Sequence, residues 1–127
     1  MNLPLGLTHP ALLVGIGGAV GSNARFWLSY WFRQQPWARD YFWGTFTINV
    51  TGSILLGLVA ALCKDRLSPG FLLLGTGFCG GYTTFSSFSL EVIEFIHAGR
   101  WDLAAVYISS SIVGGVLGFL AAYLMLR

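Results

Sequence analysis

The chain has 127 residues, of which 55% are hydrophobic and 9% are charged, and its formal net charge is +2. Soluble domains carry about 25% charged residues, so this composition excludes an ordinary soluble domain. The seven Lys and Arg residues do not form a basic patch, which argues against a nucleic-acid partner. We therefore predict one all-α integral membrane domain over residues 1–127.

Four segments are apolar enough to span a bilayer, which takes about 20 mostly apolar residues. We place these spans at 11–32, 43–63, 71–97 and 103–126. The short stretches between them carry the charges and the helix breakers, and Trp and Tyr cluster near the span ends, as at a membrane interface. The N-terminal MNLPLGLTHP has no Lys or Arg and no separate signal-peptide pattern, so we expect the first span to be retained.

The first two spans contain small residues and polar residues at helical spacing. Pairs such as Gly17 and Gly21 lie four apart, which allows close helix contacts and favours a packed oligomer. Arg25 lies inside the first span, where it could snorkel to water, anchor the topology or attract anions. In the second span Thr45, Asn49 and Ser53 share one helical face. Most membrane hydroxyls bond their own helix, but an amide such as that of Asn49 cannot be satisfied so locally.

The third span contains the most unusual stretch, GGYTTFSSFSLE at 80–91. We predict that the glycines and threonines break the helix near the membrane midplane. After the break, Phe85 and Phe88 share one face and Ser86 and Ser89 share the next. Hydroxyls and electropositive ring edges are weak, neutral donors that attract an anion without trapping it. Two bulky apolar side chains that face lipid or core are the alternative for the phenylalanines.

Backbone carbonyls at such a break suit a hard cation such as Na⁺. A glycine kink made for packing is the alternative interpretation. Further along, Glu91 is a candidate pathway residue, proton acceptor or structural partner. The spacing of Glu94 and His97 matches half of a di-iron motif, but the second half is missing. In the fourth span Tyr107 and Ser111 lie four apart, and Cys63 and Cys79 are expected to be small buried hydrophobes.

The charge distribution predicts the assembly. Lys64, Arg66 and Arg127 fall on one side of a four-span topology. Arg33, Arg39 and Arg100 fall on the other side, which gives three cations on each. Without a positive-inside bias either orientation should insert, so we predict an antiparallel, dual-topology homodimer in the cell (inner) membrane. An orientation set by charges too weak to count is the alternative.

The sequence resembles the Fluc-type (CrcB-like) fluoride channels over essentially its whole length. The resemblance is carried by GFCGGYTTFSSFSLEV (77–92), GTFTINVTG (44–52) and GSNARFWL (21–28). It implies an antiparallel homodimer with two fluoride pores and a central structural Na⁺. It implies that the pore is lined by Asn49, Phe85 and Phe88, and that a polar pathway is formed by Ser86, Ser89, Glu91, Tyr107 and Ser111. It also implies that the carbonyls of Gly80 and Thr83 bind Na⁺ and that Arg25 lies in the vestibule of the pore.

Two positions depart from the family pattern. Gly115, one turn after Ser111, stands where relatives often have Ser, so one hydroxyl of the pathway is missing or replaced by water. Ser87 stands where many relatives have Thr, a change that should matter little.

The function implied is a passive, selective fluoride channel, which is not an enzyme and which lowers cytoplasmic fluoride by electrodiffusion. A small dual-topology, proton-coupled exporter of cationic compounds has the same size and number of spans. That class needs an acidic residue early in the bundle, and the first two spans contain no Asp or Glu.

Overall fold

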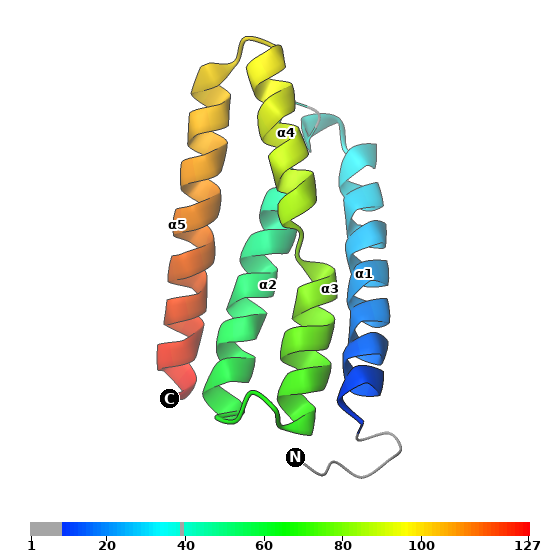
Figure 1. Ribbon diagram of the computed structural model, residues 1–127. Helices are drawn as coiled ribbons and strands as arrows, with labels where there is room; N and C mark the ends of the chain where they lie inside the picture. The colour runs from blue at the N-terminus through cyan, green and yellow to red at the C-terminus, as the bar shows by residue number, and fades with distance from the viewer. Residues whose placement is uncertain (1–8, 39) are drawn as a thin grey trace.

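The computed structural model describes residues 9–38 and 40–127, and within them the chain is helical without strands. Its elements are α1 (Pro10–Gln34), η1 (Pro36–Ala38), α2 (Trp43–Leu62), η2 (Phe71–Cys79), α3 (Gly80–Tyr82), α4 (Phe85–His97) and α5 (Trp101–Leu126). They form four antiparallel rods, of which the third consists of η2, α3 and α4 in succession (Figure 1). Helical structure thus lies over each of the four ranges proposed as spans. Arg39, part of the charge count, lies outside the described residues.

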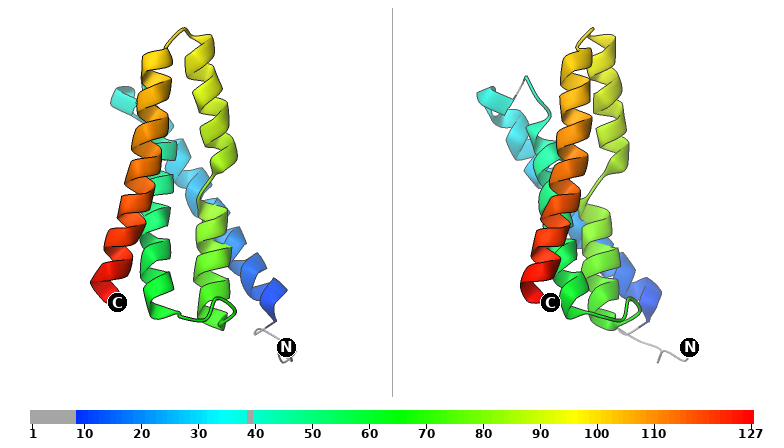
Figure 2. Two further views of the ribbon diagram at one scale, coloured as in Figure 1. Left: turned by 60° about the vertical axis from the view of Figure 1, so that its left-hand side comes forward. Right: turned by 90° about the vertical axis from the view of Figure 1, so that its left-hand side faces the viewer.

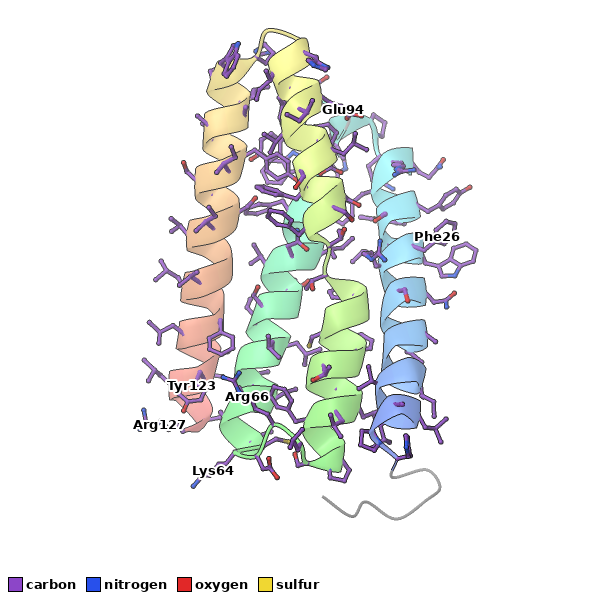
Figure 3. All side chains as sticks on the ribbon, viewed as in Figure 1. Phe26, Lys64, Arg66, Glu94, Tyr123 and Arg127 are labelled. Carbon is purple, nitrogen blue, oxygen red and sulfur yellow. The ribbon has the colours of Figure 1, made fainter. Side chains whose placement is uncertain are left out.

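Two of the described helices, α2 and α5, are individually long and apolar enough to cross a membrane. The third rod is not a single helix of membrane-spanning length, because it is interrupted. α1 is less apolar than α2 and α5, because it carries Asn23, Arg25 and Arg33. Large apolar side chains point outward from the rods. Phe26 and Trp27 on α1 are 60% and 63% exposed, and Phe26 points away from the bundle in Figure 3. Such surfaces are stable against lipid or another apolar protein surface.

The rods pack in pairs. α2 lies along α5, and α1 lies along η2 and α3 while crossing the other rods obliquely (Figure 2). η2 is a π-helical stretch. At one end of the bundle Tyr107, with no exposed surface, and Phe95 form an aromatic core with partly buried neighbours from α2 and α4. A glycine with positive φ, Gly99 (φ 73°), makes the tight turn from α4 into α5.

Small residues at helical spacing make close contacts between helices of the same chain. A side chain at Gly17 would strike the backbone of η2 at Leu73, and one at Gly57 would strike the backbone of α5 at Phe119. These glycines therefore allow rods of the same chain to approach closely. Contacts within the chain account for the spacing at these positions, because spacing alone does not say which helix packs against a glycine. The oligomer stays a prediction.

The third rod is broken, as predicted, but not at the glycines. Gly80 and Gly81 are helical within α3. The backbone is extended at Thr83 (φ −82°, ψ 157°) and Thr84 (φ −148°, ψ 117°), and α4 begins at the next residue. Gly81 is required instead because a side chain there would strike the backbone of Gly18 in α1. Threonine is β-branched and favours extended backbone, so the interruption of the helix falls at Thr83 and Thr84.

Candidate functional site

The helix break is held by an amide from the neighbouring rod. Asn49 of α2 donates from Nδ2 to the carbonyl oxygen of Thr84 at 3.0 Å. The Thr84 N–H in turn donates to Asn49 Oδ1 at 2.8 Å. Both backbone polar groups of Thr84 are therefore satisfied by one side chain, where a helical partner is missing. One of the two amide hydrogens of Asn49 is committed to this role.

Thr84 also starts the helix that follows. Its hydroxyl Oγ1 accepts the N–H of Ser87 at 3.1 Å, which is an N-cap of α4. On the other side of the break, Thr83 donates its hydroxyl to the carbonyl of Cys79 at 2.8 Å. The two threonines thus finish one helix and begin the next within two residues.

A cavity of about 410 Å³ lies beside the break. Its polar lining comes from α2, η2, the break and α5: Asn49, Ser53, Thr76, Thr83, Thr84 and Ser111. The two aromatic rings at the start of α4, Phe85 and Phe88, line it as well, with their centroids 5.9 Å apart. Phe88 meets Tyr107 edge to face at 5.1 Å, which fixes its ring, whereas Phe85 is 80% exposed. Among the described residues the lining includes no Lys, Arg or His.

Ser111 is distinct among the cavity hydroxyls. Its Oγ is buried and has no hydrogen-bond partner among the described residues. Most neighbouring hydroxyls are satisfied by their own helix, as Ser53 is by the carbonyl of Asn49 at 2.8 Å. A buried polar group without a partner costs about 1–3 kcal/mol, so the Ser111 hydroxyl is available to a ligand or water in the cavity. At Gly115, a Cβ would lie 3.4 Å from Ser53 Oγ, so Ser53 is next to the missing hydroxyl.

A second polar cluster lies outside the cavity, further along α4. Glu91 accepts two hydrogen bonds, one at Oε1 from the Thr45 hydroxyl at 2.7 Å and one at Oε2 from the Tyr107 hydroxyl at 2.5 Å. Thr45 and Tyr107 are both buried, so the carboxyl group joins α2, α4 and α5. Glu91 acts here as a structural partner, one of the roles left open from the sequence. It also lines a small neighbouring hollow that contains Arg33 and Ser87.

Arg25 reaches the break from the other side. Its Nε donates to the carbonyl oxygen of Gly81 at 3.0 Å, and its side chain is half-buried between α1 and α3. A cation that bonds a terminal carbonyl stabilises a helix C-terminus. This contact to α3 was not among the roles that the sequence suggested for Arg25.

The structure divides the predicted residues into two groups. Those at the cavity are Asn49, Gly80, Thr83, Phe85, Phe88 and Ser111. Those away from its lining are Arg25, Ser86, Ser89, Glu91 and Tyr107. Ser86 is exposed and its Oγ lies 3.2 Å from that of Thr84, while Ser89 donates to the carbonyl of its own helix at Phe85.

Four polar residues of the site were not among the predicted site residues: Thr45, Ser53, Thr76 and Thr84. The four-residue spacing of Thr45, Asn49 and Ser53 was the available signal. The structure confirms that this face of α2 is turned to the break, to Glu91 and to the cavity. For Thr84 the sequence offered no signal beyond the break itself, because its partner Asn49 is 35 positions away.

Comparison with known proteins agrees with the resemblance found from the motifs. The family model described as "CrcB-like protein, Camphor Resistance (CrcB)" matches residues 12–123. The chain is 40% identical over 120 residues to the "Fluoride-specific ion channel FluC" of Gloeobacter violaceus, covering 93% of this chain and 96% of that protein. It is 45% identical over 110 residues to the protein of the same name from Leptospira interrogans (serovar copenhageni), covering 83% and 84%. The chain therefore belongs to the CrcB-like family, and its apolar helices fit a membrane protein.

Proposed function

We propose that the chain is a passive, fluoride-selective channel. The observation that carries this proposal is the cavity beside the break, where the unpartnered Ser111 hydroxyl faces a lining of neutral donors and phenylalanine rings. The relatives named as fluoride-specific ion channels support the choice of ion. Fluoride would move by electrodiffusion, without a coupled ion.

The chemistry of the lining suits a small, strongly hydrated anion. Hydroxyl groups can replace the water of the ion, and the ring edges of Phe85 and Phe88 are electropositive. Because the described lining includes no cation, the anion would be attracted without being held, as conduction requires. Tyr107 fixes the Phe88 ring, so one wall of the constriction would be rigid, which disfavours larger anions such as chloride.

The pore would be completed by a second, antiparallel copy. Phe85 is 80% exposed on the protomer, although it lines the cavity. Covering such a ring with protein would close the open side of the pathway. The balanced cation count supports a copy of opposite orientation, and two-fold symmetry would then give two pores per dimer.

The residues at the break fit a structural Na⁺. In a continuous helix the carbonyl of Gly80 would accept the Thr84 N–H, and that of Thr83 would accept the Ser87 N–H. Here the Thr84 N–H donates to Asn49 Oδ1 instead, and the Ser87 N–H donates to Thr84 Oγ1. The two carbonyls are thus candidates for a hard cation, shared with a second copy. Bound there, Na⁺ would hold the centre of the dimer together by its charge.

Anion release from liposomes tests the proposal. The purified protein is reconstituted with potassium fluoride or potassium chloride inside, and valinomycin supports passive efflux, which ion-selective electrodes follow. We expect rapid fluoride release without chloride release. If the folded, reconstituted dimer releases no fluoride, the channel is refuted, and proton-coupled export of a cationic compound is measured next.

A further inference from the structure

A second cavity lies at the opposite end of α2 from the aromatic core. It has a volume of about 690 Å³ and is formed by the last turns of α2 and α5, the 63–70 connection and the start of η2. Its charged rim consists of Lys64, Arg66 and Arg127. Figure 3 shows these three side chains, together with Tyr123, at the same end of the molecule. We call this cavity the basic hollow.

Within the described part of the chain, the cations of the basic hollow form no ion pair with a carboxylate. Among the described residues the one ion pair is Arg100–Asp102, at the other end of α5. The nearby carboxylate of Asp65 instead accepts the N–H of Leu67 at 2.9 Å within its own turn. Three side chains with free donors therefore surround one cavity, and Arg127 also lies over the Tyr123 ring at 5.8 Å.

The lining of the basic hollow is only partly polar. Three aromatic residues line it together with the cations: Phe71 of η2, and Phe119 and Tyr123 of α5. Cations and aromatic rings thus line one hollow at the ends of the membrane-length helices α2 and α5. A phospholipid carries both matching parts, an anionic headgroup and apolar acyl chains. Basic pockets between helix ends bind anionic headgroups, because Lys and Arg donate to phosphate oxygens.

We propose that the basic hollow binds an anionic phospholipid. Its phosphate lies between Lys64, Arg66 and Arg127, and one acyl chain lies along Phe71 and Phe119. The site is separate from the cavity at the break: the two linings share no residue. It requires the membrane but does not depend on which ion the protein conducts.

Titration of the full-length protein in detergent tests the site. Native mass spectrometry compares the binding of palmitoyl-oleoyl phosphatidylglycerol with that of the phosphatidylcholine of the same chains. We expect preferential binding of the anionic lipid. Each cation near a headgroup contributes roughly a fivefold factor, so Lys64→Gln with Arg66→Gln should weaken phosphatidylglycerol binding about 25-fold. The control Arg33→Gln with Arg100→Gln removes the same charge from the other end, and its binding should change less than about threefold.

Cys63 supplies a second readout, because it lines the basic hollow whereas Cys79 is buried. Phosphatidylglycerol, but not phosphatidylcholine, should slow the labelling of Cys63 by a water-soluble maleimide. Equal weakening in both double variants, or no preference between the lipids, would overturn the site. If inorganic phosphate protects Cys63 to the same extent as phosphatidylglycerol, the hollow is a pocket for free anions, and this result would also overturn the lipid site.

Discussion

One side chain, the amide of Asn49, binds the N–H and the carbonyl of Thr84, at 2.8 and 3.0 Å, across the gap between α2 and the break. The third rod can stop and restart at this point because α2 supplies the partners that the broken helix lacks. The amide is therefore part of the architecture of the break as well as of the cavity lining.

Asn49→Ala should destabilise the protein by about 1–3 kcal/mol, since two backbone groups of Thr84 lose their partners. In Asn49→Asp the carboxylate can still accept the Thr84 N–H, but its second oxygen would face the Thr84 carbonyl oxygen and repel it. We therefore expect this variant to lose fluoride release. Thermal unfolding in detergent and electrode efflux measure the two effects. Asn23→Ala is the matched control, because the Asn23 amide donates to the Ala19 carbonyl of its own helix. Equal stability of the two alanine variants would contradict the role of Asn49.

Ser111→Ala should separate conduction from stability. The hydroxyl has no partner among the described residues, so its removal should leave the unfolding temperature unchanged or slightly higher. Fluoride release should fall if this hydroxyl replaces water around the ion. Ser110→Ala is the control, since the Ser110 hydroxyl bonds the Tyr107 carbonyl and is not part of the cavity lining. Wild-type release from the Ser111 variant would remove this residue from the pathway.

The Glu91 cluster should show energetic coupling. Glu91→Leu and Tyr107→Phe each remove the 2.5 Å bond, so the double variant should lose less stability than the sum of the single variants. We expect a coupling of about 1 kcal/mol, as for an ordinary hydrogen bond. Unfolding in denaturant measures the cycle. Tyr41→Phe combined with Glu91→Leu serves as the control and should be additive, because the Tyr41 hydroxyl lies 3.3 Å from that of Ser110 instead.

Gly57→Ala should affect the stability of the single chain, whereas Gly80→Ala should affect its association with the proposed second copy. A Cβ at position 57 would strike the Phe119 backbone, so α2 and α5 would have to separate at a cost of about 1–3 kcal/mol. At position 80 a Cβ would meet no atom within 4 Å in the protomer. We expect Gly80→Ala to leave protomer unfolding unchanged and to weaken the dimer, as measured by chemical cross-linking in membranes. A dimer unaffected by Gly80→Ala would place the partner elsewhere.

Adding one cation should bias the insertion. In intact cells an impermeant maleimide should label Cys63 on about half the copies, if both orientations occur with three cations on each side. Leu67→Lys adds a fourth cation near Lys64 and Arg66, so that end should remain cytoplasmic and labelling should fall. Leu67→Gln changes polarity without charge and should not alter labelling. Labelling of all copies in the unmodified protein would contradict dual topology.

The sequence by itself determined the four helical ranges, the existence of a break after residue 79 and the polar face of α2. Apolar length and helical spacing are local properties, so they can be read along the chain. The motifs at 21–28, 44–52 and 77–92 were enough to identify the family, which the comparisons confirm.

Only the tertiary structure decided where the break lies and what each polar group does. Glycine is compatible with helix as well as with turns, so the conformation of Gly80 and Gly81 depended on the packing of α3 against α1. Asn49 with Thr84, Thr45 with Glu91, and Arg25 with Gly81 pair residues at least 35 positions apart. Such pairings depend on which rods become neighbours, and that follows from the packing of whole helices rather than from any local pattern.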